Sequence, residues 1–159
     1  MAIWKGVFPA VTTKMTKDSQ VDVPALKSSI ERLIENGVSG VIVLPMLGEN
    51  ASLNIKEREI VIRAAVETAA GRVPVLSGLA ETTLENAQNN AKLYQSFGAN
   101  GLMVFPSLGY KTDPRETAEW YKGIASATSL PIMIYNNPIA YGVDVTVEVL
   151  KELVDTPEI

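Results

Sequence analysis

Short apolar runs alternate along the chain with longer segments in which apolar residues recur every three or four positions. The runs end in glycine, proline or polar residues, a pattern typical of buried parallel strands, whereas Leu26, Ile30 and Leu33 share one face of a helix. We therefore expect strands over Gly6–Thr13, Gly40–Pro45, Val73–Ser77, Gly101–Phe105 and Ile132–Tyr135. We expect helices over Val21–Asn36, Asn54–Ala70, Thr82–Phe97, Asp113–Thr128 and Val145–Val154.

Strand and helix repeat about every 30 residues, which is the size of a βαβ unit. This α/β spacing fits two architectures. One is an open, doubly wound five-stranded sheet, and the other is a (β/α)8 TIM barrel of which the chain covers about the first five βα units. A complete barrel takes about 250 residues, whereas this chain has 159 and ends in Asp155–Ile159, a segment with the pattern of a loop that enters another strand.

Composition indicates a packed domain, because 47% of the residues are hydrophobic and 20% are charged. The net charge of −4, without a basic run, argues against nucleic-acid and membrane partners. The chain has no cysteine and no histidine, which excludes disulfides, histidine-bound metals and Ser-His-Asp triads within it. No membrane-length apolar run or signal peptide is present, so we expect a cytoplasmic protein.

Tyr135 is the first candidate for chemistry. It follows the apolar run Ile132–Ile134 and precedes Asn136-Asn137-Pro138, so it falls at the carboxyl end of a strand, where α/β barrels place their catalytic groups. One interpretation is a proton relay, which needs a neighbouring cationic or electrophilic group. The other is a tyrosine that packs its ring and fixes its hydroxyl within the fold.

The turn Met46-Leu47-Gly48 follows the second expected strand in the same way. Its successive N–H groups could bind a carboxylate, although an ordinary turn that needs a glycine explains the pattern as well. Thr12 and Thr13, at the end of the first strand, are candidates for the same mouth or for a simple cap.

Other polar residues have simpler interpretations. Glu49, Glu81 and Asp113 lie near strand ends without the spacing of a metal site. The charged residues of the second helix are expected on its solvated face, and they are Glu57, Arg58, Glu59 and Arg63.

Four segments in this order and spacing carry a resemblance to a known family: Val7–Thr13, Gly48–Leu53, Gly71–Val75 and Tyr135–Pro138. Together they resemble the dihydrodipicolinate synthase / N-acetylneuraminate lyase family over the whole chain. The resemblance implies that residues 1–159 are the N-terminal part of a single TIM-barrel domain, usually assembled as a homotetramer (a dimer of dimers). It also implies a lysine Schiff base with a pyruvate-like 2-oxo acid, no cofactor and no metal. The lysine would fall a few residues beyond Ile159, since neither Lys111 nor Lys151 matches it.

The resemblance assigns roles to individual positions. Tyr135 matches the tyrosine that carries protons to and from the imine. Met46 and Leu47 stand where the family has two threonines, so the backbone of Met46, Leu47 and Gly48 is predicted to hold the substrate carboxylate without the hydroxyl relay.

Three further positions are predicted for the mouth or a subunit interface. Leu108 stands where the family has an aromatic residue that reaches a neighbouring subunit, and Tyr110 is a candidate to replace it. Ala140 stands where true dihydrodipicolinate synthases have an arginine for the second substrate, and loss of such a charged contact costs about 1.5–3 kcal/mol.

We therefore predict a class I lyase or aldolase that acts on pyruvate or a related 2-oxo acid. Within the family, the alternatives are a pyrroline-4-hydroxy-2-carboxylate deaminase and a 2-keto-3-deoxy sugar acid dehydratase or aldolase. Outside it, the alternatives are a non-catalytic five-stranded α/β binding module and a lyase-like scaffold without activity.

Overall fold

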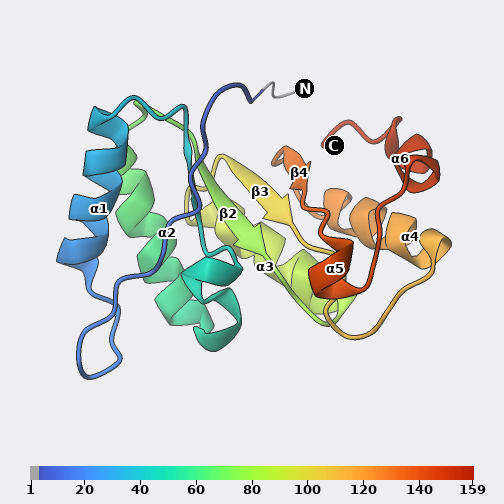
Figure 1. Ribbon diagram of the computed structural model, residues 1–159, viewed down its shortest axis with the longest axis horizontal. Helices are drawn as coiled ribbons and strands as arrows, with labels where there is room; N and C mark the ends of the chain where they lie inside the picture. The colour runs from blue at the N-terminus through green and yellow to red at the C-terminus, as the bar shows by residue number, and fades with distance from the viewer. Residues whose placement is uncertain (1–3) are drawn as a thin grey trace.

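A computed structural model describes residues 4–159, in which four parallel strands alternate with helices (Figure 1). The strands are β1 (Val41–Val43), β2 (Val75–Leu79), β3 (Gly101–Val104) and β4 (Ile132–Ile134). The α-helices are α1 (Val23–Glu35), α2 (Ile55–Ala69), α3 (Leu84–Ser96), α4 (Pro114–Ala125), α5 (Pro138–Tyr141) and α6 (Val147–Leu153). Two 3-10 turns, η1 (Met46–Gly48) and η2 (Asn50–Ser52), follow β1.

The strands pair in the order β1-β2-β3-β4, every pair being parallel. Alternate strand residues face two different cores. Val41, Val43 and Val75 pack with the helices, whereas Ile42 and Met103 belong to a second cluster without residues of α1 to α4. Sequential order with the helices on one face is the arrangement of a (β/α)8 barrel, and it rules out the doubly wound sheet, whose strand order reverses and whose helices cover both faces.

The first expected strand is shorter than predicted. In place of a strand over Gly6–Thr13, the structure has one parallel bridge between Ala10 and Ile42. Val11 N–H donates to Ile42 O at 2.8 Å, and Ile42 N–H donates to Pro9 O at 3.0 Å. Proline has no N–H for a ladder, and Gly6 has a φ of +93°, so regular pairing does not extend further. The segment nevertheless occupies the place of a first strand beside β1.

Helix boundaries lie within a few residues of the predicted ones because the caps are encoded locally. Asn54 accepts hydrogen bonds from the N–H groups of Lys56 and Glu57, and the Glu57 carboxylate accepts one from Asn54 N–H, which completes a capping box. Asp113 and Glu116 form a second capping box before α4. Among the described residues, no helix is long and apolar enough to cross a membrane.

Candidate active site at the carboxyl ends of the strands

The turn after β1 is held in an uncommon backbone conformation. Leu44 and Glu49, which flank η1, have left-handed φ values of +54° and +61°. For residues with a Cβ atom this conformation is unfavourable, and such strain concentrates at functional sites. Leu44 is fully buried, so the surrounding core fixes the turn.

Two neighbouring segments hold η1 and the following η2 in place. Thr13 Oγ1 donates to Gly48 O at 2.7 Å, and Asn50 Nδ2 donates to Gly78 O at 3.0 Å. A Cβ atom at Gly78 would lie only 2.1 Å from Leu44 O, so this close approach requires a glycine. The buried Thr13 therefore supports the turn through its hydrogen bond to Gly48 O, whereas Thr12 is exposed.

Two of the turn's amides remain available to a ligand. Gly48 N–H donates to Pro45 O at 2.8 Å, and Glu49 N–H donates to Met46 O at 3.1 Å. Within the described residues, the N–H groups of Met46 and Leu47 have no acceptor, as expected at the start of a helical turn. Met46 and Leu47 are 37% and 69% exposed, while Gly48 is buried.

Tyr135 lies directly after β4 and shares a cavity with this turn. Its N–H donates to Val104 O at 2.9 Å, and its ring packs on Phe105 with 4.7 Å between the centroids. The cavity has a volume of about 230 Å³ and is lined by Met46, Leu47, Tyr135 and Tyr141. The remaining lining residues are Phe8, Ala10, Ile42, Pro45, Met103 and Phe105.

Tyr141 is a site residue that the sequence analysis missed. It ends the short helix α5, which lies at the end of the sheet to which the arrows of β2 and β3 point (Figure 1). Its ring meets Tyr135 at 6.1 Å and 73°, and burial, followed by the nearby Tyr135, raises the pKa of the Tyr141 phenol. The Asn137 cap before Pro138 and the left-handed Gly142 after the helix are signals that could have indicated α5.

The three residues predicted for the mouth or interface lie outside this cavity. Tyr110 is 61% exposed, its hydroxyl donates to Glu116 at 3.0 Å, and it lines a different cavity of about 340 Å³. Leu108 packs at the edge of the inner cluster, and Ala140 is exposed on α5.

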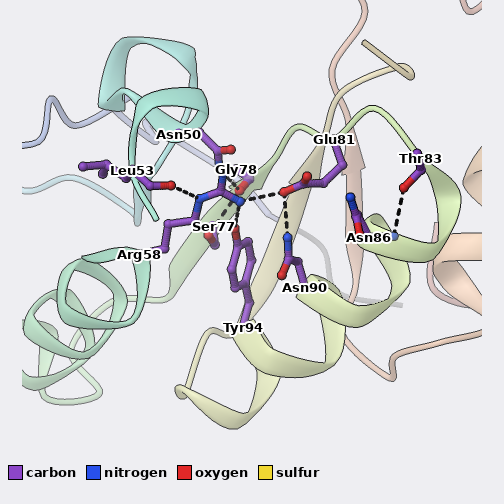
Figure 2. Close-up of polar contacts among 10 residues, drawn as sticks. All are labelled: Asn50, Leu53, Arg58, Ser77, Gly78, Glu81, Thr83, Asn86, Asn90 and Tyr94. Carbon is purple, nitrogen blue, oxygen red and sulfur yellow. Dashed lines mark hydrogen bonds and ion pairs between the residues drawn. The ribbon is translucent and has the colours of Figure 1, made fainter. Parts of the chain in front are cut away.

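A largely buried polar network links helices α2 and α3 with the segment after β2 (Figure 2). Arg58 Nη1 donates to Glu81 Oε1 at 2.6 Å and to the Tyr94 hydroxyl at 3.1 Å, and Arg58 Nε donates to Leu53 O at 2.9 Å. Asn90 donates to the same Glu81 oxygen at 2.7 Å. The expectation that Arg58 lies on a solvated face is therefore wrong, since the side chains of Arg58 and Glu81 are each only 12% exposed.

The acidic residues near the strand ends do not assemble into a metal site. Within residues 4–159, no group of three or more histidine, cysteine, aspartate or glutamate side chains is placed to hold an ion. Glu81 instead binds Arg58 and Asn90, and Asp113 caps α4.

The fold and the cavity place the chain in the class of (β/α)8-barrel proteins, with the candidate site at the carboxyl ends of the strands. The chain belongs to the dihydrodipicolinate synthetase family, which matches residues 3–159. The resemblance drawn from the sequence motifs is thereby confirmed.

Relatives in this family differ in the reaction for which they are named. The 4-hydroxy-tetrahydrodipicolinate synthase of Methanosarcina barkeri is 33% identical over 151 residues, which cover 95% of this chain and 51% of the relative. YagE of Escherichia coli K12, provisionally named a 2-dehydro-3-deoxy-D-gluconate aldolase, is 32% identical over 155 residues, with 98% and 51% covered. The chain thus spans about half the length of the curated relatives that it matches.

Solved structures confirm the fold. The crystal structure of YagE in complex with pyruvate superimposes with a TM-score of 0.91 at 32% identity, covering 97% of this chain and 52% of the other. The chloride-inhibited dihydrodipicolinate synthase of Acinetobacter baumannii, also with pyruvate, gives 0.95 at 28% identity, with 99% and 54% covered.

Proposed function

We propose that this chain is the N-terminal part of a single-domain class I lyase that acts on pyruvate or a related 2-oxo acid through a lysine Schiff base. The observation that carries the proposal is the shared cavity, which Tyr135 lines together with a turn whose Met46 and Leu47 amides have no acceptor among residues 4–159. A carboxylate is the natural ligand of such N–H groups. The pyruvate complexes of related proteins support the choice of a 2-oxo acid.

The end of the chain supports a position for the lysine. Ile132 N–H donates to Glu158 O at 2.6 Å, so the backbone at residues 158–159 begins to pair with β4. In the pair of β3 and β4, Leu102 donates to Pro131 O and lies opposite Ile132. By the same pattern Ile132 lies opposite Ile159, so Tyr135, three residues after Ile132, lies opposite a position three residues beyond Ile159. A lysine about there would point to the same face as Tyr135.

The proposed chemistry needs no metal and no organic cofactor. The lysine amine condenses with the ketone of the substrate and releases water, and the resulting imine accepts the electron pair when a carbon–carbon bond breaks or a C3 proton leaves. The Tyr135 phenol carries the protons. The Met46 and Leu47 amides hold the carboxylate.

The residues of the site disfavour the lysine-biosynthetic reaction. Neither threonine of the family pattern stands before Gly48, and Ala140 offers no charge to a second carboxylate. We therefore propose an aldolase, dehydratase or deaminase of the same family, in a cytoplasmic homotetramer.

Reductive trapping tests the proposal directly. The intact protein is incubated with pyruvate and sodium borohydride, and its mass is measured alongside that of a homologue known to form the imine. We expect a covalent adduct on a lysine in the strand after β4. A protein that stays unmodified while the homologue is trapped would exclude the Schiff base.

A further inference from the structure

The side chains that line the cavity beside Tyr135 carry almost no polar groups. Of the ten residues that line it, none is charged, and the two phenol hydroxyls of Tyr135 and Tyr141 are the only side-chain hydrogen-bonding groups apart from the weakly accepting Met sulfurs. The other side chains are aliphatic, thioether or aromatic, as Ile42 and Met103 illustrate.

Tyr141 is fixed in this wall by packing on both sides. Phe105, which is 1% exposed, meets Tyr141 edge-on with 5.6 Å between the centroids and an angle of 80°. Tyr135 meets it at 6.1 Å and 73°. Tyr141 N–H donates to Asn137 O at 3.0 Å, which anchors the end of α5. The rings of Phe105 and Tyr141 therefore form an apolar surface next to the Tyr135 phenol, which is proposed to move protons.

Such a wall favours some substituents over others on the substrate that reacts with the bound 2-oxo acid. A hydroxyl pressed against the aliphatic and aromatic part of this wall loses its water without gaining a partner, whereas an added methylene gains contact. An apolar pocket typically favours one extra methylene about 10–200-fold and disfavours an added hydroxyl up to about 100-fold.

We infer that the lyase prefers an aldehyde partner with an uncharged alkyl or aryl substituent, and that Tyr141 determines this specificity. The inference rests on the proposed function. In the reaction, C3 of the lysine-bound pyruvate enamine bonds to the aldehyde carbon, and the aldehyde oxygen takes up a proton. Water then releases the product from the lysine, so pyruvate and R–CHO combine to one 4-hydroxy-2-oxo acid with no atom lost.

The test compares two aldehydes on the intact protein. The ratio of kcat/KM for benzaldehyde to that for glyceraldehyde is measured with pyruvate as the donor, and we expect at least a tenfold preference for benzaldehyde. Tyr141→Phe should keep this ratio, whereas Tyr141→Ser should lower it at least tenfold. Ile139→Ser is the matched control, because Ile139 lies on the same helix but is 98% exposed outside the cavity. It should leave the ratio unchanged.

Borohydride trapping separates the possible failures. If pyruvate is trapped but glyceraldehyde is preferred, the specificity inference is wrong and the proposed function stands. If pyruvate is trapped and Tyr141→Ser lowers kcat/KM equally for both aldehydes, Tyr141 does not determine the specificity and only supports the fold. If no adduct forms under conditions that trap a homologue, both proposals fall.

Discussion

At the carboxyl ends of the strands, the two faces of the sheet differ in whether their polar side chains are hydrogen-bonded within the protein. On the helix side, the Arg58 guanidinium reaches Glu81, Tyr94 and the Leu53 carbonyl (Figure 2). On the inner side, the hydroxyls of Tyr135 and Tyr141 stand in an apolar wall, and among the described residues neither has a hydrogen-bond partner from the protein.

This difference separates groups that build the scaffold from groups that are available to a ligand. Half-buried polar atoms that the fold leaves unpaired are unfavourable unless water or a ligand completes them. The Arg58 network instead uses its polar groups to tie the end of η2, the segment after β2 and helix α3 together. Substitutions on the two sides should therefore affect different quantities.

The largest effect is expected on turnover from Tyr135→Phe in the intact protein. The substitution removes the phenol proton but keeps the ring against Phe105, so kcat should fall about 10²–10⁴-fold. The free energy of unfolding should change by less than about 0.5 kcal/mol. Steady-state kinetics and denaturant unfolding of the same preparation measure both quantities. A variant that is destabilised but turns over normally would place Tyr135 with the scaffold groups.

The largest effect on stability is expected from Glu81→Ala. It leaves the Arg58 side chain, which is 12% exposed, without its carboxylate. Breaking a fully buried pair in this way costs about 3–5 kcal/mol, so the loss from this largely buried pair should reach up to that amount. Replacing both residues by methionine removes the unpaired charge and should recover most of the loss. Urea unfolding of the single and double variants measures this recovery.

A surface pair on the same helix provides the control for Glu81→Ala. Glu59 and Arg63 are 2.7 Å apart, but their side chains are 39% and 55% exposed. Glu59→Ala should therefore cost only about 0.5 kcal/mol. An equal loss in the two alanine variants would show that burial does not set the strength of the Arg58–Glu81 pair.

The sequence pattern predicted those features of the fold that are determined by residues close together in the chain. The capping box of Asn54 and Glu57 lies within four residues, so the start of α2 could be placed closely. The apolar runs identified β1 to β4 for a similar reason. The motifs identified the family, although the spacing of strands and helices alone could not choose between a barrel and a doubly wound sheet.

Contacts that the fold creates could not be predicted in this way. Arg58 and Glu81 are 23 residues apart, and in the sequence Arg58 stands among charged residues that resemble a solvated face. Tyr141 reaches the cavity only through the four-residue helix α5, which is too short for a periodic pattern. The first strand was overestimated because its apolar pattern outweighed the missing N–H of Pro9.

Two buried tyrosines, Tyr94 and Tyr121, allow a paired and an unpaired hydroxyl to be compared. The expected changes in the free energy of unfolding are smaller than for Glu81→Ala. The Tyr94 hydroxyl accepts a hydrogen bond from Arg58, so Tyr94→Phe should cost about 1–3 kcal/mol. The buried Tyr121 hydroxyl has no partner among the described residues, so Tyr121→Phe should change stability by less than about 0.5 kcal/mol at neutral pH. Thermal unfolding of both variants measures the difference, and a larger loss from Tyr121→Phe would contradict it.

A small effect is expected at alkaline pH, where the Tyr121 phenol should lower the stability of the fold. Burial raises the pKa of the Tyr121 phenol, so the folded protein keeps this proton at a pH where the unfolded chain has lost it. The free energy of unfolding is therefore unaffected by this group below the ordinary phenol pKa of about 10. It falls as the pH rises from there toward the higher pKa of the folded state. At pH 10.5 the loss due to Tyr121 should be about 0.8 kcal/mol, and Tyr121→Phe should remove it. Urea unfolding of the protein and the variant at pH 8 and pH 10.5 isolates this term, because the other titrating groups are common to both. A variant that loses as much stability as the parent would show that the phenol ionises equally well in the folded state, and that the unpaired hydroxyl is in contact with water.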